Sequence, residues 1–308
     1  MRTTYLLLAL AFLAMASCSE DKLTPSPEKD NELIAFPQGD NTYDKEFEQF
    51  YDTYGVQVLY KYTQTDFRWN VTSYLPYTCD LPDDKYIEPS WQFIKNDCLS
   101  IWGDDFLKQY LPFRILLSSQ IYSVGDTNGD DKKDTIPLTK TAIYGLNHIT
   151  FGKVNSSITQ MTADEKKQAI GDMAFALIGY ATSQGKIEIP SDFTALHNKY
   201  GNNTGSGLAT PDNPWGYNAA GFFEYLQGMD VYYDFAHYVR QLVMNSQTEF
   251  TDKYLNDTFD CGAEWNQATG KYDPVHPIRS KYEIVLKYFK EKFGIDLHSI
   301  GNKVSEIK

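Results

Sequence analysis

One long helix, predicted to be buried on most of its surface, constrains the fold of this chain more than any other feature. Thr162 and Glu165 form a capping box, in which each residue can bond to the backbone of the other. Apolar residues then recur at three- and four-residue intervals up to about Ser183, and Gly185 suits the left-handed turn that ends such a helix. Because the helix is apolar on so many sides, the rest of the fold must be built around it.

Shorter patterns predict a sheet beside this helix and a mainly helical C-terminal part. Val56, Val58, Tyr60 and Tyr62 recur at every second position and so share one side, which is typical of a half-buried strand. The fold class that follows is α+β, with a mixed sheet next to the central helix. We expect strands at 55–62, 113–122 and 142–151, and later helices at about 229–245 and 277–293.

Two polar segments lie between these elements. Residues 126–134 carry acidic side chains at alternate positions, but glycine and glutamate do not fall where a calcium loop needs them. The segment is therefore predicted to be a solvated hairpin loop. Residues 191–220 are rich in Asn, Gly, Pro and Asp, which predicts a long irregular segment of the kind that often carries function.

The first residues are typical of an exported lipoprotein. An apolar run ends in Ala16 and Ser17, directly before Cys18, so we expect a signal peptide at 1–17 and a lipid on Cys18. Residues 18–45 are polar and should form a lipidated flexible tether, followed by one domain at 46–308. The acidic start after Cys18 resembles the surface-export signal of Bacteroidota lipoproteins, which predicts an outer-membrane protein facing the cell exterior.

Charge and cysteine content narrow the classes of partner. The net charge of −13 disfavours binding to nucleic acid. Cys79, Cys98 and Cys261 remain after the signal, and they do not form a metal-binding pattern. Cys79 and Cys98 could pair in an exported protein, but buried free thiols are the preferred interpretation.

Aromatic residues are abundant, with 23 Tyr, 18 Phe and five Trp. Their large faces favour protein interfaces and can stack on sugar rings, although a packed core is the more ordinary role. The densest group flanks the irregular segment and marks a candidate ligand cleft. Its members are Trp215, Tyr217, Phe222, Phe223 and Tyr225.

The order of these pieces resembles the substrate import-associated zinc metallohydrolase lipoproteins of Bacteroidota, also described as zinc-binding metallopeptidases. The resemblance rests on the lipoprotein start, on the strands near 56–62 and 111–117, and on the closing segment 293–297. It implies a zincin-like fold for the domain. It also implies an association with TonB-dependent nutrient import.

In that family a central helix carries His-Glu-Phe-x-His, and a later helix supplies a third zinc ligand. Placed on this sequence, the two histidine positions fall on Gly171 and Phe175, the catalytic glutamate position on Asp172, and the third ligand position on His237. Glycine and phenylalanine cannot ligate zinc, whereas a catalytic zinc normally takes three protein ligands. No catalytic or metal residue is therefore assigned with certainty, and no cofactor is expected.

These observations predict a catalytically inactive, metallopeptidase-like accessory protein of a TonB-dependent import system for a glycan or a peptide. The alternative is an active zinc hydrolase with atypical ligands, for which His148, Asp172 and His237 could converge. A purely structural cell-surface protein is a third interpretation. Stoichiometric zinc would favour the enzyme, and ligand binding without turnover would favour the accessory role.

Overall fold

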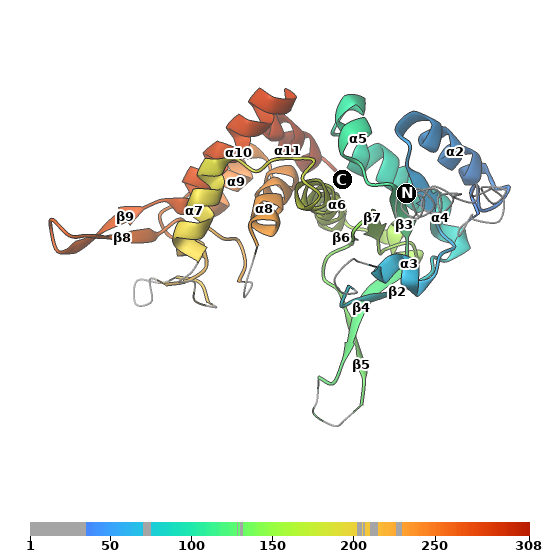
Figure 1. Cartoon of the computed structure of the whole chain (residues 1–308), viewed down its shortest axis with the longest axis horizontal. Coiled ribbons are helices and arrows are strands. Elements are labelled where there is room, and N and C mark those ends of the chain that lie inside the picture. The colour runs from blue at the N-terminus through green and yellow to red at the C-terminus, as the bar shows by residue number, and fades with distance from the viewer. Residues whose placement is uncertain are drawn as a thin grey trace, which may run out of the picture. The chain divides into compact units, whose positions relative to one another are not determined.

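The predicted central helix is α6 (Ala163–Ser183), and it lies in the middle of the computed structural model (Figure 1). The predicted capping box is present, with Thr162 and Glu165 each bonded to the backbone of the other. Every residue from 169 to 182 is buried. Strands β6 and β7 and helix α8 all contact α6, so the fold is built around this helix as the sequence predicts.

The structure describes residues 35–69, 75–127, 129, 132–201, 205, 207–209, 215–225 and 230–308. The signal peptide, Cys18 and most of the predicted tether lie outside them. Residues 37–308 form one unit. Its first helix, α2 (Thr42–Tyr54), begins inside the segment predicted to be tether, because Asn41 and Asp44 form a capping box and the Asp44 carboxylate accepts a bond from Tyr60 Oη.

The main sheet is mixed and has the strand order β1-β3-β7-β6. Strands β1, β3 and β7 are parallel, and β6 pairs antiparallel with β7. The register places Val58 beside Ile115 and Ile115 beside Ile149, all of them fully buried. These bounds are β1 (Gln57–Leu59), β3 (Arg114–Leu117), β6 (Ala142–Tyr144) and β7 (His148–Phe151).

Two of the predicted strands are divided in the structure. The segment 113–122 turns at Ser118, whose hydroxyl donates to the Gln120 carbonyl after the turn and to the Asp80 carbonyl at the end of β2. The segment 142–151 is a hairpin, closed by a bond from the Gly145 N–H to the His148 carbonyl. Both predictions treated the segment as one strand because of its apolar flanks, although Ser118 and Ser119 in the first and Gly145 and Asn147 in the second are residue types favoured in turns.

The second half of the segment 113–122 has a different role. Strand β4 (Gln120–Gly125) leaves the main sheet and pairs with β2 (Thr78–Asp80) and β5 (Asp134–Pro137), all antiparallel. The β4–β5 register joins Gly125 to Asp134, which confirms the predicted hairpin around residues 126–134. Figure 1 shows this hairpin extending away from α6.

Short helices cover the sheet on the N-terminal side. Trp91 anchors them, with its ring edge-on to Phe47 at 5.2 Å and to Phe50 at 5.0 Å between centroids. Cys98 lies in a π-helical turn and is buried. The elements are α3 (Gln64–Arg68), η2 (Asp84–Tyr86), α4 (Ile87–Phe93), η3 (Ile94–Leu99), α5 (Asp104–Tyr110) and η4 (Ser156–Gln160).

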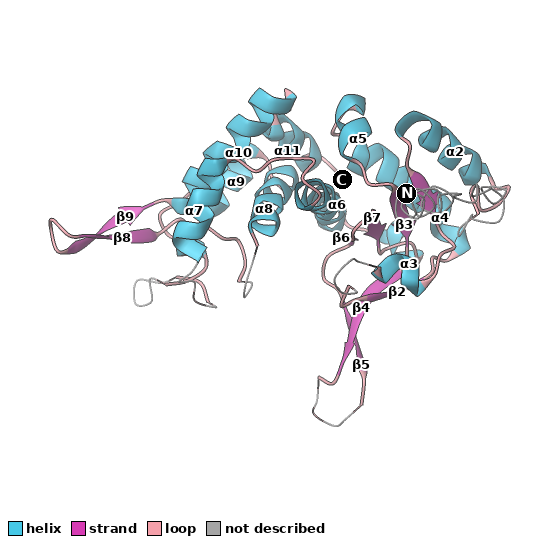
Figure 2. Ribbon diagram, in the orientation of Figure 1, coloured by secondary structure: helices cyan, strands magenta, loops and turns pink. Residues whose placement is uncertain are grey.

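The C-terminal part is mainly helical, as predicted (Figure 2). Helix α10 has the predicted bounds and ends at Gly294, which takes a φ of +70°. Helix α7 corrects the prediction of an irregular segment from residue 191, since Phe193 and His197, one turn apart, are both buried. The elements are α7 (Ser191–Gly201), η5 (Asn218–Ala220), α8 (Val231–Met244), α9 (Gln247–Tyr254), β8 (Gly262–Asn266), β9 (Lys271–Val275), α10 (Pro277–Phe293) and α11 (Leu297–Ser305).

Cys79, Cys98 and Cys261 are free thiols, so the preferred interpretation of the cysteines is confirmed. Burial raises the pKa of each thiol, most strongly that of Cys98. Within the described part of the chain, none of the helices combines the length and apolar character needed to cross a bilayer.

Candidate functional site

Helices α6 and α8 pack side by side, and the sequence-predicted site residues lie where they meet. Asp230 caps α8 by accepting a bond from the Tyr233 N–H. Gly171 allows the close approach of the two helices, because a Cβ at this position would lie 2.2 Å from Met244 Cγ. A larger residue at 171 therefore requires Met244 to move.

Phe175, one turn after Gly171, also faces α8. Its ring is nearly perpendicular to the rings of Tyr233 and His237, with centroids 4.7 and 5.4 Å apart. The structure thus brings positions 175 and 237 into contact, as the alignment with the family predicts. The contact is aromatic packing, which contributes about 0.5–1.5 kcal/mol beyond the burial of area.

Asp172 is buried and both of its carboxylate oxygens are engaged. Oδ2 accepts a bond of 2.6 Å from the Thr141 N–H, and Oδ1 accepts one of 2.7 Å from Arg240 Nε. Hydrogen bonds of this charge-assisted kind are stronger than neutral ones. Asp172 therefore ties α8 and the start of β6 to the central helix, and each of its oxygens already accepts a hydrogen bond from the protein.

His237 is almost fully buried beside a carboxylate. Its Nε2 lies 3.2 Å from Glu224 Oε1, but the direction of the ring does not allow a hydrogen bond, so Nε2 has no hydrogen-bond partner among the described residues. Burial lowers the pKa of His237 to about 3, against the smaller opposing effect of Glu224. The imidazole is neutral at physiological pH.

A lysine supplies the positive charge at this point of the fold. Lys140 Nζ lies 3.1 Å from Glu224 Oε1 and 2.7 Å from Tyr233 Oη, and the Tyr233 hydroxyl donates to the same Glu224 oxygen at 2.9 Å. Burial alone would raise the pKa of Glu224, but its neighbours lower it on balance, His237 first and then Lys140. Of these two, Lys140 is the one that forms a hydrogen bond and an ion pair with the carboxylate.

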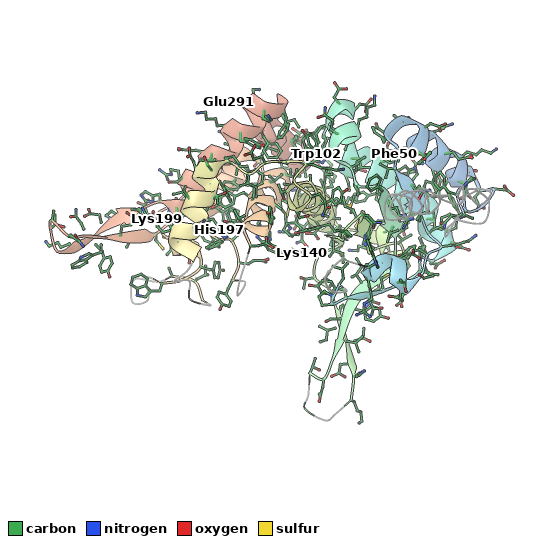
Figure 3. All side chains as sticks on the ribbon, in the orientation of Figure 1. Phe50, Trp102, Lys140, His197, Lys199 and Glu291 are labelled. Atoms are coloured by element: carbon green, nitrogen blue, oxygen red, sulfur yellow. The ribbon has the colours of Figure 1, made fainter. Side chains whose placement is uncertain are left out.

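The ammonium of Lys140 also lies over aromatic faces. It is 5.4 Å from the centroid of the Phe175 ring and 5.3 Å from that of Tyr233, within the range of cation–π attraction. Figure 3 shows Lys140 below α6, in the region where the strands approach α8. Sequence reasoning missed Lys140 and Glu224. One signal in the sequence could have indicated Glu224, namely its place inside the aromatic group. The pairing with Lys140 had no signal, because 84 residues separate the two partners along the chain.

A family model described as "Putative zinc-binding metallo-peptidase" matches residues 41–298. The chain belongs to this family. A crystal structure of a putative zinc-binding metallo-peptidase from Bacteroides caccae is similar, with a TM-score of 0.50 and 14% identity, covering 87% of this chain and 94% of that one. At this identity the likeness shows a shared fold, and it supports the predicted α+β, zincin-like class. No match exists among the curated proteins.

The zinc that the metallo-peptidase family name implies does not fit the residues of this site. Gly171 and Phe175 offer no donor atom, and His237 with Glu224 supplies only two of the three ligands a catalytic zinc takes. The Lys140 ammonium, 3.1 Å from Glu224, would repel a divalent cation. In the described ranges no group of three or more His, Cys, Asp or Glu residues could hold a metal ion.

The alternative site built on His148 does not form either. His148 is buried in β7, where Nε2 lies 2.8 Å from the Phe67 carbonyl and Nδ1 lies 3.1 Å from the Thr150 hydroxyl. Both ring nitrogens are therefore engaged within the sheet. Burial lowers the pKa of His148 to about 4, so this ring is also neutral.

Asp234, three residues before His237 in α8, belongs to a buried ionic network. Asp234 Oδ2 lies 2.7 Å from Lys281 Nζ and 2.8 Å from His197 Nδ1, which joins α8 to α10 and α7. Lys281 is fully buried, also donates to the Gly221 carbonyl, and lies 3.9 Å from the centroid of the Phe222 ring. Burial lowers the pKa of Lys281, and Asp234 opposes that effect.

The five aromatic residues of the predicted ligand cleft do not line one cavity. Phe222 is buried between Lys281 and His197. Phe223 packs on Tyr238 and Tyr254, with ring centroids 4.7 and 4.8 Å apart. Phe222 therefore has the ordinary role of a core residue, whereas Phe223 is half-buried against α8 and α9.

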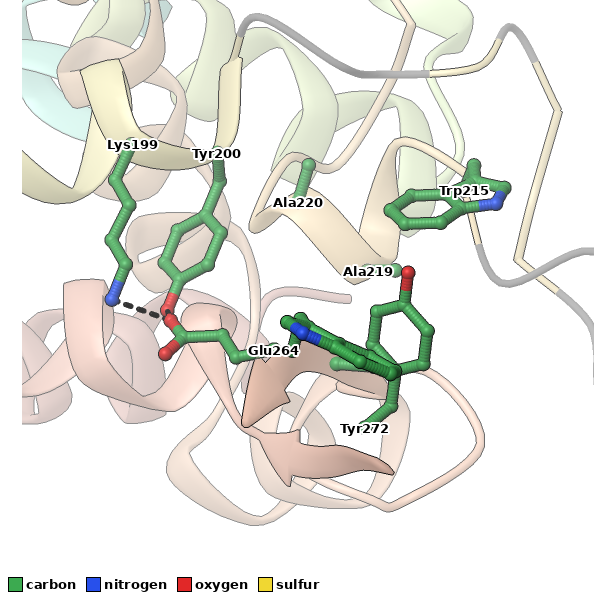
Figure 4. Close-up of a pocket in the computed structure, with 10 residues that line it drawn as sticks. Lys199, Tyr200, Trp215, Ala219, Ala220, Glu264 and Tyr272 are labelled. Atoms are coloured by element: carbon green, nitrogen blue, oxygen red, sulfur yellow. Dashed lines mark hydrogen bonds and ion pairs between the residues drawn. The ribbon is translucent and has the colours of Figure 1, made fainter. Parts of the chain in front are cut away.

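The remaining three are more accessible. Tyr217 is half-buried, its N–H bonded to the Gly207 carbonyl, and Tyr225 lies at the surface. Trp215 lines a cleft, which has a volume of about 280 Å³ and opens between α7 and the β8–β9 hairpin (Figure 4). The hairpin residues of this cleft were not singled out from the sequence, although Trp265 and Tyr272 flank a turn that ends in glycine at position 270.

Proposed function

We propose that this protein is a surface-exposed outer-membrane lipoprotein that retains the metallo-peptidase scaffold without its zinc chemistry. Its role is that of an accessory subunit, which binds a glycan or a peptide for a TonB-dependent nutrient importer. The observation that carries the proposal is the replacement of the two motif histidines by Gly171 and Phe175, with Lys140 in their vicinity.

The contacts around these positions support a role in stability instead of catalysis. Phe175 is held by Tyr233 and His237, and Asp172 by Thr141 and Arg240. A general base needs a free oxygen within reach of the proton that it removes. The alternative, an active hydrolase, is supported by one observation, the proximity of His237 to Glu224. A measurement of zinc binding distinguishes the two functions.

Rebuilding the family site tests the proposal. The variant carries Gly171→His, Phe175→His and His237→Glu, with Met244→Ala to make room and Lys140→Ala to remove the cation. Calorimetric titration with zinc should show about one site per rebuilt chain, and none in the unaltered protein, since three donors are needed.

The matched control places glutamine at positions 171 and 175 and keeps the other three substitutions, so that side-chain volume is similar without imidazole. The proposal fails if the unaltered protein binds zinc as tightly as the rebuilt one. If the rebuilt chain folds, as circular dichroism reports, but binds no zinc, the assignment of the family site to α6 and α8 is wrong.

The proposed location rests on the sequence around Cys18 and has its own test. Cys18→Ala should release the protein from the outer membrane, because the acyl chains supply the anchor. Protease added to intact cells should degrade the unaltered protein if it faces outward. Protection of the protein until the cells are opened would contradict an outward orientation.

A further inference from the structure

The cleft beside the β8–β9 hairpin lies apart from the α6–α8 contact and has exposed aromatic walls. Trp265 and Tyr272 are directly opposite each other in the hairpin register, with ring centroids 5.2 Å apart. Trp215 stands on the other wall, 6.0 Å from Tyr272 and nearly perpendicular to it. Their exposed fractions are 49% for Trp215, 55% for Trp265 and 54% for Tyr272. Three large, half-exposed rings therefore line one space, in edge-to-face contact with one another.

One end of the cleft is polar. The Tyr200 hydroxyl donates to Glu264 Oε1, and Lys199 Nζ pairs with the same oxygen. These bonds lower the pKa of Glu264, so its side chain is a carboxylate at neutral pH. Figure 4 shows this group on one side of the small residues Ala219 and Ala220, with Trp215 and Tyr272 on the other.

The hairpin itself fixes the arrangement. Residues 262–266 pair with 271–275, and side chains of successive residues in a strand point to opposite faces, so Glu264 and Trp265 leave the strand in different directions. The floor is made of small residues because Gly216 and Ala219 approach neighbouring backbone: a Cβ at Gly216 would lie 1.9 Å from the Ala209 nitrogen. The cleft is thus built by the fold, between α7, η5 and the hairpin.

We propose that this cleft binds a neutral saccharide. The apolar face of a pyranose ring stacks on aromatic faces, while its hydroxyl groups need a carboxylate acceptor and ammonium or phenol donors at the edge. Glu264, Lys199 and Tyr200 supply these groups. The volume of about 280 Å³ is close to the lower limit of about 300 Å³ for ligand pockets, so the cleft takes the end of a chain or a short oligosaccharide.

Charge and openness separate a saccharide from other ligands. The net charge of −13 works against acidic polysaccharides and nucleic acids. An apolar peptide side chain favours an enclosed apolar socket, whereas these rings are half exposed and border an ionic group. The inference names the ligand class for the proposed binding role and rests on that role, but it does not depend on whether the α6–α8 site binds zinc.

Titration calorimetry in buffer with EDTA tests the inference, with the hexasaccharides of cellulose, starch, xylan, mannan and chitin as probes. At least one should bind with a dissociation constant below about 1 mM. Trp265→Ala and Trp215→Ala should each weaken that binding about tenfold or more, and Glu264→Gln severalfold. Trp69→Ala is the matched control, since Trp69 is a similarly exposed tryptophan that does not line this cleft.

Circular dichroism establishes that each variant is folded. The inference is overturned if no probe binds, or if binding is the same in the Trp265 and Trp215 variants as in the unaltered protein. It is also overturned if tryptic casein peptides bind in a Trp265-dependent manner while the saccharides do not. Zinc-dependent cleavage of those peptides in buffer without EDTA would contradict the proposed accessory role. The titrations with saccharides would still decide whether the cleft binds a saccharide.

Discussion

Asp172 offers the sharpest distinction between a structural and a catalytic role at the former motif. The substitution Asp172→Asn preserves the shape of the side chain, but the amide cannot accept from both of its donors. If its oxygen keeps the bond to the Thr141 N–H, its NH₂ group faces the Arg240 Nε–H, and two donors then oppose each other. The guanidinium of Arg240, whose side chain is 16% exposed, loses its partner.

The expected loss of unfolding free energy is about 3–5 kcal/mol, because breaking a buried ion pair from one side leaves an uncompensated charge. This is a large share of the roughly 5–15 kcal/mol that stabilises a typical protein. Urea unfolding followed by circular dichroism measures it. In the double variant Asp172→Asn with Arg240→Met, no charge remains buried. Its loss of unfolding free energy should therefore be smaller than the sum of the two single losses by about 1–3 kcal/mol, which is the coupling energy.

Two results would refute the structural role of Asp172. One is a loss below about 1 kcal/mol in Asp172→Asn, within the range of ordinary surface substitutions. The other is strict additivity of Asp172→Asn and Arg240→Met. Asp192→Asn is a suitable control, since this carboxylate is exposed in the first turn of α7 and should change stability by no more than about 0.5 kcal/mol.

Two further predictions follow from buried groups. The folded-state pKa values of about 3 for His237 and about 4 for His148 lie below the unfolded value near 6.5, so stability is complete above pH 6.5 and should fall by about 1.4 kcal/mol per pH unit per histidine on acidification. Urea unfolding from pH 7 to 4.5 checks this, and His237→Leu should reduce the slope; a flat profile contradicts it. In the buried network around Asp234, Asp234→Asn should cost about 3–5 kcal/mol, and Lys281→Met less, because His197 Nδ1 still contacts the Asp234 carboxylate when the lysine is removed. Thermal unfolding of both variants measures the order, and the reverse order would contradict the account.

Local signals predicted the parts of the fold that depend on neighbours in sequence. The capping box at Thr162 and Glu165 places the start of α6, and Pro277 with Gly294 places both ends of α10. These residues act within one turn of the chain, so a single sequence contains the whole interaction. The turn at Ser118 depends also on a bond to the Asp80 carbonyl of β2, which only the folded sheet supplies. The turn at Gly145 is closed by a local bond to His148, and its signal, Gly145 with Asn147, was present in the sequence but not used.

The candidate site divides in the same manner. The family alignment placed two ligand positions on Phe175 and His237, and these two side chains are in contact in the structure. Nothing near Lys140 in sequence indicates that its ammonium lies beside Glu224 and over Phe175, since these contacts join separate elements. The hairpin cleft escaped prediction because Trp215 and Tyr272 come together only when η5 and β9 are folded.

Zinc content of the purified mature protein tests the central claim most directly. The protein is dialysed against trace zinc and its metal is measured by mass spectrometry, with His237→Ala and Asp172→Ala as companions. The account predicts zinc at background level in all three proteins, because Gly171 and Phe175 provide no ligand. About one zinc per chain in the unaltered protein, lost in His237→Ala, would contradict it and establish a metal site with atypical ligands.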